Sequence, residues 1–291
     1  MTFEERVPLS RFTTLGTGGP ARWFGRPESV EELSEALRWA ADQGVAASVV
    51  GLGSNLLVAD EGVDGLVLKL AGDLAAVTVD GETVLAGAGA PLAVCLHRAR
   101  AASLGGLEFA CAIPGTAGGG VWMNAGAYGS DIAAVLDRAL IVSAEGESWR
   151  SPTELGLEYR RSALRPGEVV AQTEFRLYSR PADEVKATVA EMQARRKEAQ
   201  PTNKRTFGSV FKNPHELTAG RMLEACGLRG YRIGGAQISP RHANFIENAD
   251  GARSVDAIAL MVEARRRARE QFGVELEHEV QLLGSLVLPK T

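Results

Sequence analysis

One short segment combines three side chains that could do chemistry. In GSVFKNP, residues 208–214, a hydroxyl, an ammonium and an amide lie within five residues, at Ser209, Lys212 and Asn213. A serine can deliver a proton to a reacting atom when a charged neighbour or a water chain restores that proton. A serine after glycine in a turn more often bonds only the backbone. The esterase motif G-x-S-x-G is absent, so the sequence does not indicate an acyl-enzyme nucleophile.

Charged side chains stand out at two further places. The motif YRRS, residues 159–162, offers adjacent guanidinium groups at Arg160 and Arg161. The planar guanidinium matches a carboxylate, although a solvated arginine pair is the alternative. Glu279 lies with two other acids on one face of segment 274–282, whose apolar and polar residues alternate as in a strand. On the residues alone, Glu279 is either a functional acid or a solvated one.

A glycine-rich segment is predicted to form the main binding surface. Residues 113–129 read IPGTAGGGVWMNAGAYG and carry no charged side chain. Glycine permits tight turns and close approach to the main chain, and successive N–H groups can then bind an oxyanion. Val121, Trp122, Met123 and Tyr128 would need burial, which favours a packed, ligand-cradling loop over a flexible linker. Backbone dipoles, rather than side-chain cations, would meet a diphosphate.

A second glycine turn, GLGSN at residues 51–55, follows a short apolar run. It does not match the dinucleotide fingerprint G-x-G-x-x-G, because the third glycine position is Leu56 and no helix is expected to follow. The P-loop motif is absent as well. A phosphate-binding turn and a plain strand connection both remain open for this stretch.

Local patterns predict the elements that must position these groups. Ser29 and Glu32 match a capping box before a helix that ends at Gly44. Hairpin turns are expected at Asp80-Gly81 and Glu145-Gly146. Periodicity predicts further helices at 91–103, 181–200, 217–226 and 254–272, and strands at 45–50, 56–58, 66–70, 139–142, 169–178, 232–238, 244–247 and 274–282. The order indicates an α+β protein with domains at 1–70, 71–180 and 181–291.

The composition is that of an ordinary globular protein. The chain has 291 residues, of which 45% are hydrophobic and 23% charged, and its net charge is -4. This charge gives no reason to expect nucleic acid or an anionic membrane as a partner. Cys95, Cys111 and Cys226 lack metal-binding spacing and are expected to be reduced core residues. Without a signal peptide or a membrane-length apolar run, the expected location is the cytoplasm.

Taken together, the motifs resemble the UDP-N-acetylenolpyruvoylglucosamine reductase (MurB) family. The resemblance rests on the glycine-rich segment, GLGSN, YRRS, GSVFKNP and the terminal LEHEVQLLG, and it extends over nearly the whole chain. It implies a flavoprotein fold of the vanillyl-alcohol-oxidase (PCMH) type, with FAD-binding subdomains at 1–70 and 71–180 and a substrate-binding domain at 181–291. It also implies a reductase of peptidoglycan synthesis that converts UDP-N-acetylglucosamine enolpyruvate to UDP-N-acetylmuramate with NADPH.

The resemblance further implies residue roles. Ser209 would donate a proton to C2 of the enolpyruvyl group, while Arg160 and Glu279 would polarise the substrate carboxylate and stabilise the enolic intermediate. Residues near the substrate's diphosphate would be Lys212 and Asn213, with Arg229 and His242 close by. FAD would be held by Gly51, Gly53, Ser54, Asn55, Pro114, Gly115, Thr116, Gly118, Gly119, Asn124, Gly126, Ala127 and Tyr128.

The physical chemistry agrees with these roles. Hydride transfer from flavin N5 to C3 would push charge into the carboxylate, where Arg160 and a Glu279 that holds or shares a proton would stabilise it. The three side chains are therefore expected to gather at the reactive edge of the flavin.

Two departures from the family pattern are informative. Only Ser162–Gly167 separate YRR from the next strand, so the chain resembles the shorter type without a tyrosine-bearing insertion. GLGSN lacks the histidine that tethers flavin in related oxidases, so the FAD would be non-covalent.

Two alternatives remain at this stage. The first is a sugar or hydroxy-acid oxidase on the same flavin scaffold, which would consume oxygen rapidly once reduced. The second is a non-catalytic nucleotide-sugar-binding protein that lacks flavin absorbance. In either case the expected partners are small molecules, and a monomer is expected.

Overall fold

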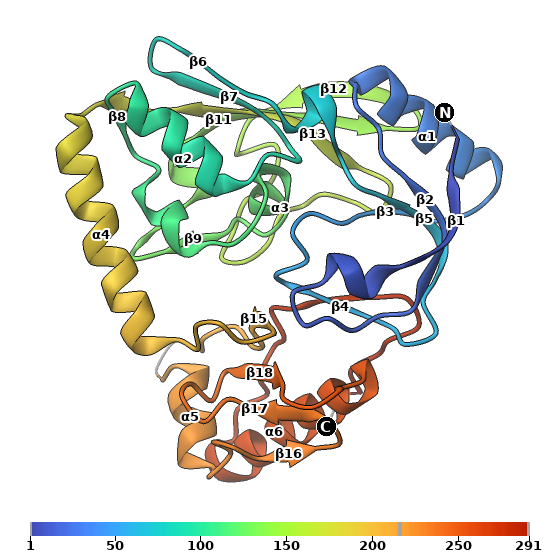
Figure 1. Cartoon of the computed structure of the whole chain (residues 1–291), viewed down its shortest axis with the longest axis vertical. Helices are drawn as coiled ribbons and strands as arrows, with labels where there is room; N and C mark the ends of the chain where they lie inside the picture. The colour runs from blue at the N-terminus through green and yellow to red at the C-terminus, as the bar shows by residue number, and fades with distance from the viewer. Residues whose placement is uncertain (1, 215–216, 290–291) are drawn as a thin grey trace. The chain divides into compact units, whose positions relative to one another are not determined.

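The structure is a computed structural model that describes residues 2–214 and 217–289. The chain divides into two compact units, each assembled from separate stretches (Figure 1). Unit 1 holds Met1–Glu5, Trp23–Leu52 and Gly65–Arg196. Unit 2 holds Arg6–Arg22, Gly53–Asp64 and Lys197–Thr291. The division into three consecutive domains stays a prediction.

Three strands begin in one unit and end in the other, namely β1 (Glu4–Pro8), β2 (Pro20–Gly25) and β5 (Val63–Leu68). They belong to a four-stranded sheet of order β1-β2-β5-β3, in which β3 (Ala47–Val49) is parallel to β5. The predicted turn at residues 51–55 follows β3 and leads into β4 (Leu56–Val58). The boundary between the units falls inside this turn, after Leu52.

Unit 1 is built on a five-stranded antiparallel sheet of order β12-β11-β13-β7-β6. Its strands are β6 (Val77–Asp80), β7 (Thr83–Gly87), β11 (Leu136–Ser143), β12 (Gly146–Arg150) and β13 (Val169–Arg176). Helices α2 (Leu92–Ala101) and α3 (Ala117–Trp122) contact this sheet at β7, and α1 (Val30–Asp42) contacts it at β11. Side chains from the sheet and the helices share one apolar core. Both predicted hairpin turns are present.

The helices of unit 1 follow their local signals closely. Ser29 Oγ accepts the Glu32 N–H at 3.3 Å, as expected of the cap of α1. The predicted helix at 91–103 is shorter, because Pro91 is its N-cap and Ser103 takes a left-handed φ of 57°. Helix α4 (Ala182–Ala199), whose last residues already belong to unit 2, buries only Val185, in keeping with its many charges. Two short antiparallel pairs complete the unit, β8 (Leu104–Gly105) with β14 (Tyr178–Ser179) and β9 (Gly126–Ala127) with β10 (Ser130–Asp131).

Unit 2 is built on an antiparallel sheet of order β15-β18-β17-β16. Its strands are β15 (Thr206–Ser209), β16 (Arg232–Ile233), β17 (Ala236–Ile238) and β18 (Phe245–Asn248). Helix α6 (Ser254–Phe272) packs against β16 and β17, and α5 (Ala219–Ala225) packs against α6. The single strand predicted at 232–238 is a hairpin, because Gly234 takes a φ of 53° and turns the chain.

The strand predicted at 274–282 is largely wrong. Only β19 (Gln281–Leu283) is a strand, and it pairs in parallel with β4. Within residues 274–280, one isolated bridge is described, between His278 and Phe211. Leu276 and Val280 are nevertheless fully buried, so the alternation of apolar residues marks a buried face of a segment that does not pair as a strand. Periodicity reports which side chains are buried and does not by itself supply a strand partner.

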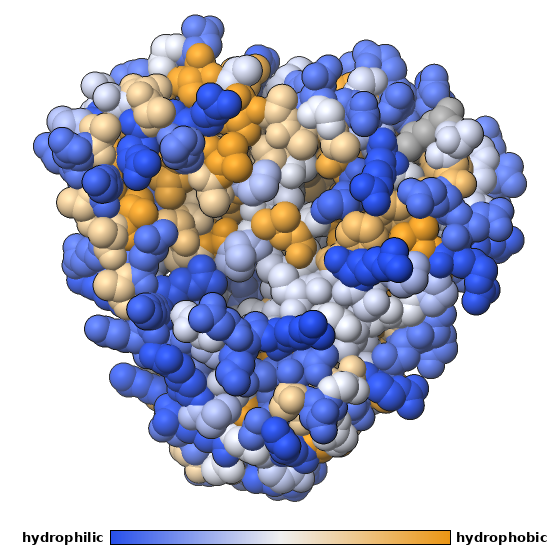
Figure 2. All heavy atoms as spheres, viewed as in Figure 1, coloured by the Kyte–Doolittle hydropathy of each residue, from blue (hydrophilic) through white to orange (hydrophobic). Residues whose placement is uncertain are grey.

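Surface character differs between regions of the face shown in Figure 2. Apolar side chains gather over α2 and β6, and exposed large apolar residues in this part of the fold include Val94 on α2 and Leu85 on β7. The region of α5 and β16 is mainly hydrophilic. Among the described residues, no helix is long and apolar enough to cross a membrane.

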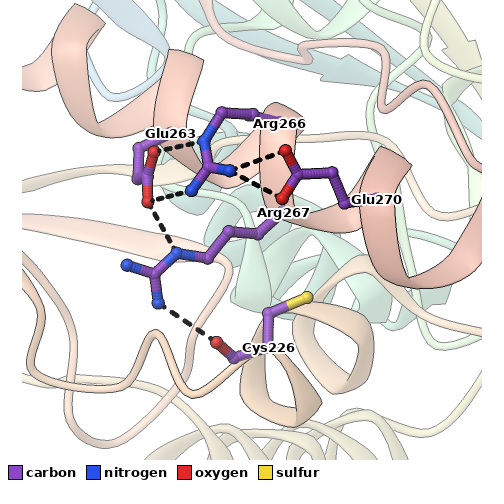
Figure 3. A network of polar contacts seen from close by, with 5 residues as sticks. All are labelled: Cys226, Glu263, Arg266, Arg267 and Glu270. Carbon is purple, nitrogen blue, oxygen red and sulfur yellow. Dashed lines mark hydrogen bonds and ion pairs between the residues drawn. The ribbon is translucent and has the colours of Figure 1, made fainter.

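An ion-pair network joins α6 to the end of α5 (Figure 3). The Glu263 carboxylate accepts two hydrogen bonds from Arg266, both at 2.8 Å, and one from Arg267 at 2.6 Å. Arg267 also donates to the carbonyl of Cys226, the C-cap of α5, at 3.3 Å. The hydrogen bonds from Arg266, followed by those from Arg267, lower the pKa of Glu263 from 4.5 to about 2.

Replacing Glu263 with Gln should destabilise unit 2 by about 0.5–1 kcal/mol at neutral pH, a modest value because the Arg266 partner is half-exposed. A carboxylate whose pKa is lowered by folding stabilises the protein above its unfolded pKa. The Glu263 contribution should therefore disappear as the pH falls from about 4.5 to about 2. Urea unfolding at pH 7 and pH 3 measures this. An equal difference between wild type and variant at both pH values would contradict the account.

Candidate active site

In unit 1, Gly51 of the GLGSN turn lies against the start of the glycine-rich segment. A Cβ atom added at Gly51 would come within 2.8 Å of Thr116 Oγ1. Thr116 is the N-cap of α3, and its hydroxyl accepts the Gly119 N–H at 3.3 Å. On the other side, the Lys69 ammonium donates to the Gly51 carbonyl at 2.8 Å. Burial, together with the nearby charge of Arg26, lowers the pKa of Lys69.

This junction fits the diphosphate of a dinucleotide. Within the described part of the chain, the main-chain N–H groups of Gly51 and Thr116 have no hydrogen-bond acceptor. Thr116 is only 5% exposed, and a buried N–H group requires an acceptor. An oxyanion held by convergent main-chain N–H groups would supply one. The residues predicted to hold FAD in unit 1 therefore offer the right donor chemistry.

The glycine-rich segment is packed, as predicted, but it is not a continuous loop. Residues 117–122 form α3, and a Cβ at Gly118 would lie 2.7 Å from the Ala88 Cβ. Val121 and Met123 are buried, as expected. Tyr128 is 41% exposed, so the expectation that it needs burial is wrong. Its hydroxyl donates to the carbonyl of Met192 on α4 at 2.7 Å.

Asn124 links this segment to the arginine motif. Its amide nitrogen donates to Asp131 at 3.2 Å and to the carbonyl of Glu158 at 3.0 Å, and its oxygen accepts the Ala133 N–H at 2.9 Å. Asn124 itself is 2% exposed and has a left-handed φ of 38°. Both the nitrogen and the oxygen of the Asn124 side chain are thus hydrogen-bonded to protein groups.

Arg160 lies directly on the glycine-rich segment. Its guanidinium donates to the carbonyl of Gly126 at 2.6 Å and to that of Asn124 at 3.5 Å, and it lies 4.9 Å from the centre of the Tyr159 ring. Ser162 adds a bond to the carbonyl of Trp122 at 2.8 Å. The structure therefore brings Arg160 together with the predicted flavin-holding residues Asn124 and Gly126 of unit 1.

In unit 2, Ser209 ends β15 at an irregular point of the sheet. Thr206 pairs with Glu247 and Ser209 with Phe245, so β15 has one residue more than β18 between these pairs. Gly208, inside this bulge, has a φ of 81°. Bulges of this kind redirect side chains and recur beside active sites. Within the described residues, the Ser209 hydroxyl has no hydrogen-bond partner and is half-buried, so it remains available to a ligand.

Glu279 and the second half of the glycine turn lie beside the Ser209 segment. The Glu279 N–H donates to the carbonyl of Val210 at 2.8 Å, and Asn55 Nδ2 donates to the carbonyl of Glu279 at 3.1 Å. A Cβ added at Gly208 would lie 3.2 Å from the carbonyl oxygen of Ser54. Glu279 is half-buried, so the description of it as a fully solvated acid is wrong.

The predicted diphosphate-binding residues surround α5 and the GSVFKNP segment. The Lys212 ammonium pairs with Glu277 at 2.6 Å, and Asn213 accepts the Ala219 N–H at 3.1 Å. His242 lies against α5, since a Cβ at Gly220 would come within 2.7 Å of its ring. Burial lowers the pKa of His242, with a further contribution from Arg229. Arg229 itself pairs with Glu224 at 2.9 Å.

The structure thus forms two groups of candidate residues. Unit 1 joins Gly51, Thr116, Asn124, Gly126 and Arg160, and unit 2 joins Gly53–Asn55, Ser209, Lys212, Asn213, Arg229, His242 and Glu279. That Arg160 gathers with Ser209 and Glu279 around one flavin stays a prediction.

Lys69 was missed by sequence reasoning, although a lone lysine at the end of the apolar run Leu66–Leu68 was a usable signal. The described residues contain no cluster of ligands suited to a metal ion.

Comparison with known proteins places these groups in context. A family model described as an FAD binding domain matches residues 22–151, and one described as the UDP-N-acetylenolpyruvoylglucosamine reductase C-terminal domain matches residues 200–283. These matches confirm the predicted fold class, an α+β protein with an FAD-binding module and a C-terminal domain.

Two relatives match over almost their full length. UDP-N-acetylenolpyruvoylglucosamine reductase 2 of Symbiobacterium thermophilum is 44% identical, over 95% of this chain and 91% of the relative. The reductase of Rubrobacter xylanophilus is 43% identical, over 95% and 94%. The crystal structure of UDP-N-acetylenolpyruvylglucosamine reductase (MurB) from Thermus caldophilus superposes with a TM-score of 0.84 at 38% identity, covering 97% of this chain and 100% of that one. The chain belongs to the UDP-N-acetylenolpyruvoylglucosamine reductase (MurB) family.

Proposed function

We propose that this protein reduces the enolpyruvyl ether of UDP-N-acetylglucosamine to UDP-N-acetylmuramate, using FAD and NADPH, in peptidoglycan precursor synthesis. The observation that carries the proposal is the pair of main-chain N–H donors at Gly51 and Thr116, neither of which has an acceptor among the described residues, in a chain of this family. Backbone donors suit a diphosphate. NADPH as the reductant, a UDP-sugar as the partner and a monomeric state are parts of the same proposal.

The reaction adds one hydride to C3 and one proton to C2 of the enolpyruvyl group, so that the C=C bond becomes a C–C bond and NADPH leaves as NADP⁺. When bound, FAD supplies the redox chemistry between NADPH and C3. Ser209 delivers the proton to C2, and its hydroxyl is available because it bonds no described residue. Arg160 polarises the substrate carboxylate through its guanidinium, while Glu279 stabilises the enolic charge by holding or sharing a proton. Lys212, Asn213, Arg229 and His242 bind the diphosphate end of the substrate.

Product analysis tests this proposal. The purified protein, incubated anaerobically with NADPH and the enolpyruvyl sugar, should consume one NADPH per sugar. Mass spectrometry should find a product heavier than the substrate by two hydrogen atoms. Consumption of NADPH that requires oxygen and leaves the sugar unchanged would favour an oxidase instead.

Replacing Glu279 with Gln should slow reoxidation of the reduced protein by the sugar about 10–100-fold, because the amide keeps a hydrogen bond but cannot share a proton. Reduction by NADPH should stay within about twofold of wild type. Rapid-mixing absorbance of the flavin measures both steps. Glu275→Gln is the matched control, since Glu275 comes from the same alternating segment and bonds Arg265 instead. Full activity of the Glu279 variant would show that this acid has no part in the reaction.

A further inference from the structure

The segment that carries Ser209 depends on a buried amide that no sequence motif indicates. Asn244 lies immediately before β18, is 3% exposed and faces the main chain of Phe211. Its side-chain oxygen accepts the Phe211 N–H at 2.9 Å, and its side-chain nitrogen donates to the Phe211 carbonyl at 2.8 Å. Both polar groups of one buried peptide residue are therefore satisfied by one side chain.

The Asn244 amide takes the place of a missing strand partner. The ladder between β15 and β18 ends at the pair of Ser209 and Phe245, after the bulge. Beyond that pair, the Val210 N–H donates to the Asn244 carbonyl at 2.9 Å, and the Asn244 side chain continues the pairing at Phe211. The residues on the C-terminal side of Ser209 are thus fixed by main-chain and side-chain groups of Asn244 together.

Asn244 also connects the other candidate residues of unit 2. Its own N–H donates to His242 Nδ1 at 3.2 Å, and the carbonyl of Val210, held next to it, accepts the Glu279 N–H at 2.8 Å. A displacement of Asn244 would therefore move the backbone of Ser209, Glu279 and His242 relative to one another. Misplacement by about 1 Å can cost about 10²-fold in rate.

We propose that Asn244 is the positioning residue that fixes the Ser209 segment for proton delivery, through its paired hydrogen bonds to Phe211. The inference rests on the proposed role of Ser209. Asn244 does not touch the reacting atoms in this account. It acts by fixing the position of the backbone at Val210 and Phe211, which neighbours Ser209 and bonds Glu279.

The chain offers a matched control for a simple loss of stability. Asn248, at the other end of β18, also makes two side-chain hydrogen bonds to the main chain. Its nitrogen donates to the Leu15 carbonyl at 3.0 Å, and its oxygen accepts the Ala252 N–H at 2.9 Å. Its side chain makes no described bond to residues 209–212. Asn248→Ala should therefore destabilise unit 2 without altering the geometry of Ser209.

The test compares Asn244→Ala with Asn248→Ala in the FAD-bound protein. Asn244→Ala should slow reoxidation by the enolpyruvyl sugar about 10²-fold, while reduction by NADPH stays within about twofold. It should also speed hydrogen exchange of the Phe211 amide, which needs no turnover to measure. Asn248→Ala should change neither quantity. Normal reoxidation in Asn244→Ala, or equal slowing in both variants, would overturn the proposal.

A second variant protects the test against failure of Asn244→Ala to fold. Asn244→Asp keeps the acceptor for the Phe211 N–H but, when ionised, loses the donor to the Phe211 carbonyl. A protonated carboxyl offers both, so reoxidation by Asn244→Asp should recover as the pH falls, relative to wild type at the same pH. An unchanged ratio of the two rates across pH would contradict the positioning role. If Ser209→Ala itself reoxidises normally, the proton-donor assignment fails, whereas the exchange of Phe211 still reports whether Asn244 holds the segment.

Discussion

Ser209→Ala should bind FAD and accept electrons from NADPH at the wild-type rate, yet reoxidation of the reduced protein by the enolpyruvyl sugar should slow by about 10³-fold or more. Removal of a positioned proton donor typically costs about 10²–10⁴-fold. No described side chain bonds the Ser209 hydroxyl, so its removal leaves no described protein group without a partner. The fold should therefore be unaffected.

Anaerobic rapid mixing separates the two steps of this experiment. Flavin absorbance falls during reduction by NADPH and returns when the sugar is added. Ser148→Ala on β12 is a control, because that residue lies on an exposed strand of unit 1. Equal slowing of both steps by Ser209→Ala would indicate a general defect and would refute the proton-donor role.

Gly51→Val should yield a folded protein that purifies without flavin. The new Cβ would come within 2.8 Å of Thr116 Oγ1, and the valine methyl groups need still more room. The turn and the N-terminus of α3 would have to separate, which would move the N–H donors of Gly51 and Thr116 apart. Since these donors are proposed to bind the diphosphate, the expected loss of FAD affinity is about 10²-fold or more, at roughly 1.5–3 kcal/mol for each lost hydrogen bond to a charged group.

The flavin content of the purified variant, read from its absorption spectrum, checks this expectation. Gly81→Asn is the control, because Gly81 has a φ of 55°, nothing lies near its Cβ position, and asparagine tolerates this conformation. A melting curve of each apoprotein shows whether it is folded. Wild-type flavin content in Gly51→Val would contradict the assignment of this junction to the cofactor.

Elements with complete local signals could be predicted from the sequence. Helix α6 begins at Ser254 and ends at Phe272, as predicted, because an acid in its first turn and the left-handed Gly273 after its last turn fix both ends. The turn at Asp80-Gly81 is equally local. The strand prediction for segment 274–280 failed because a strand requires a partner, and the partner in this case is a short irregular stretch at residues 210–212.

The residues of the candidate site could be predicted from the sequence, whereas the residues that hold them in place could not. Ser209, Arg160 and Glu279 were found because they lie in motifs with a family resemblance. Asn244 and Lys69 were missed because their contacts join residues far apart in the chain, Asn244 to Phe211 across 33 positions and Lys69 to Gly51 across 18. The bulge at Gly208 likewise depends on the pairing of β15 with β18, which local periodicity does not encode.

One anaerobic spectral titration of the purified wild-type protein tests the central claim most directly. The protein should show a flavin spectrum as isolated, lose it on addition of NADPH, and regain it when UDP-N-acetylglucosamine enolpyruvate is added in the absence of oxygen. A colourless protein, or a bleached flavin that recovers only when air is admitted, would contradict the account.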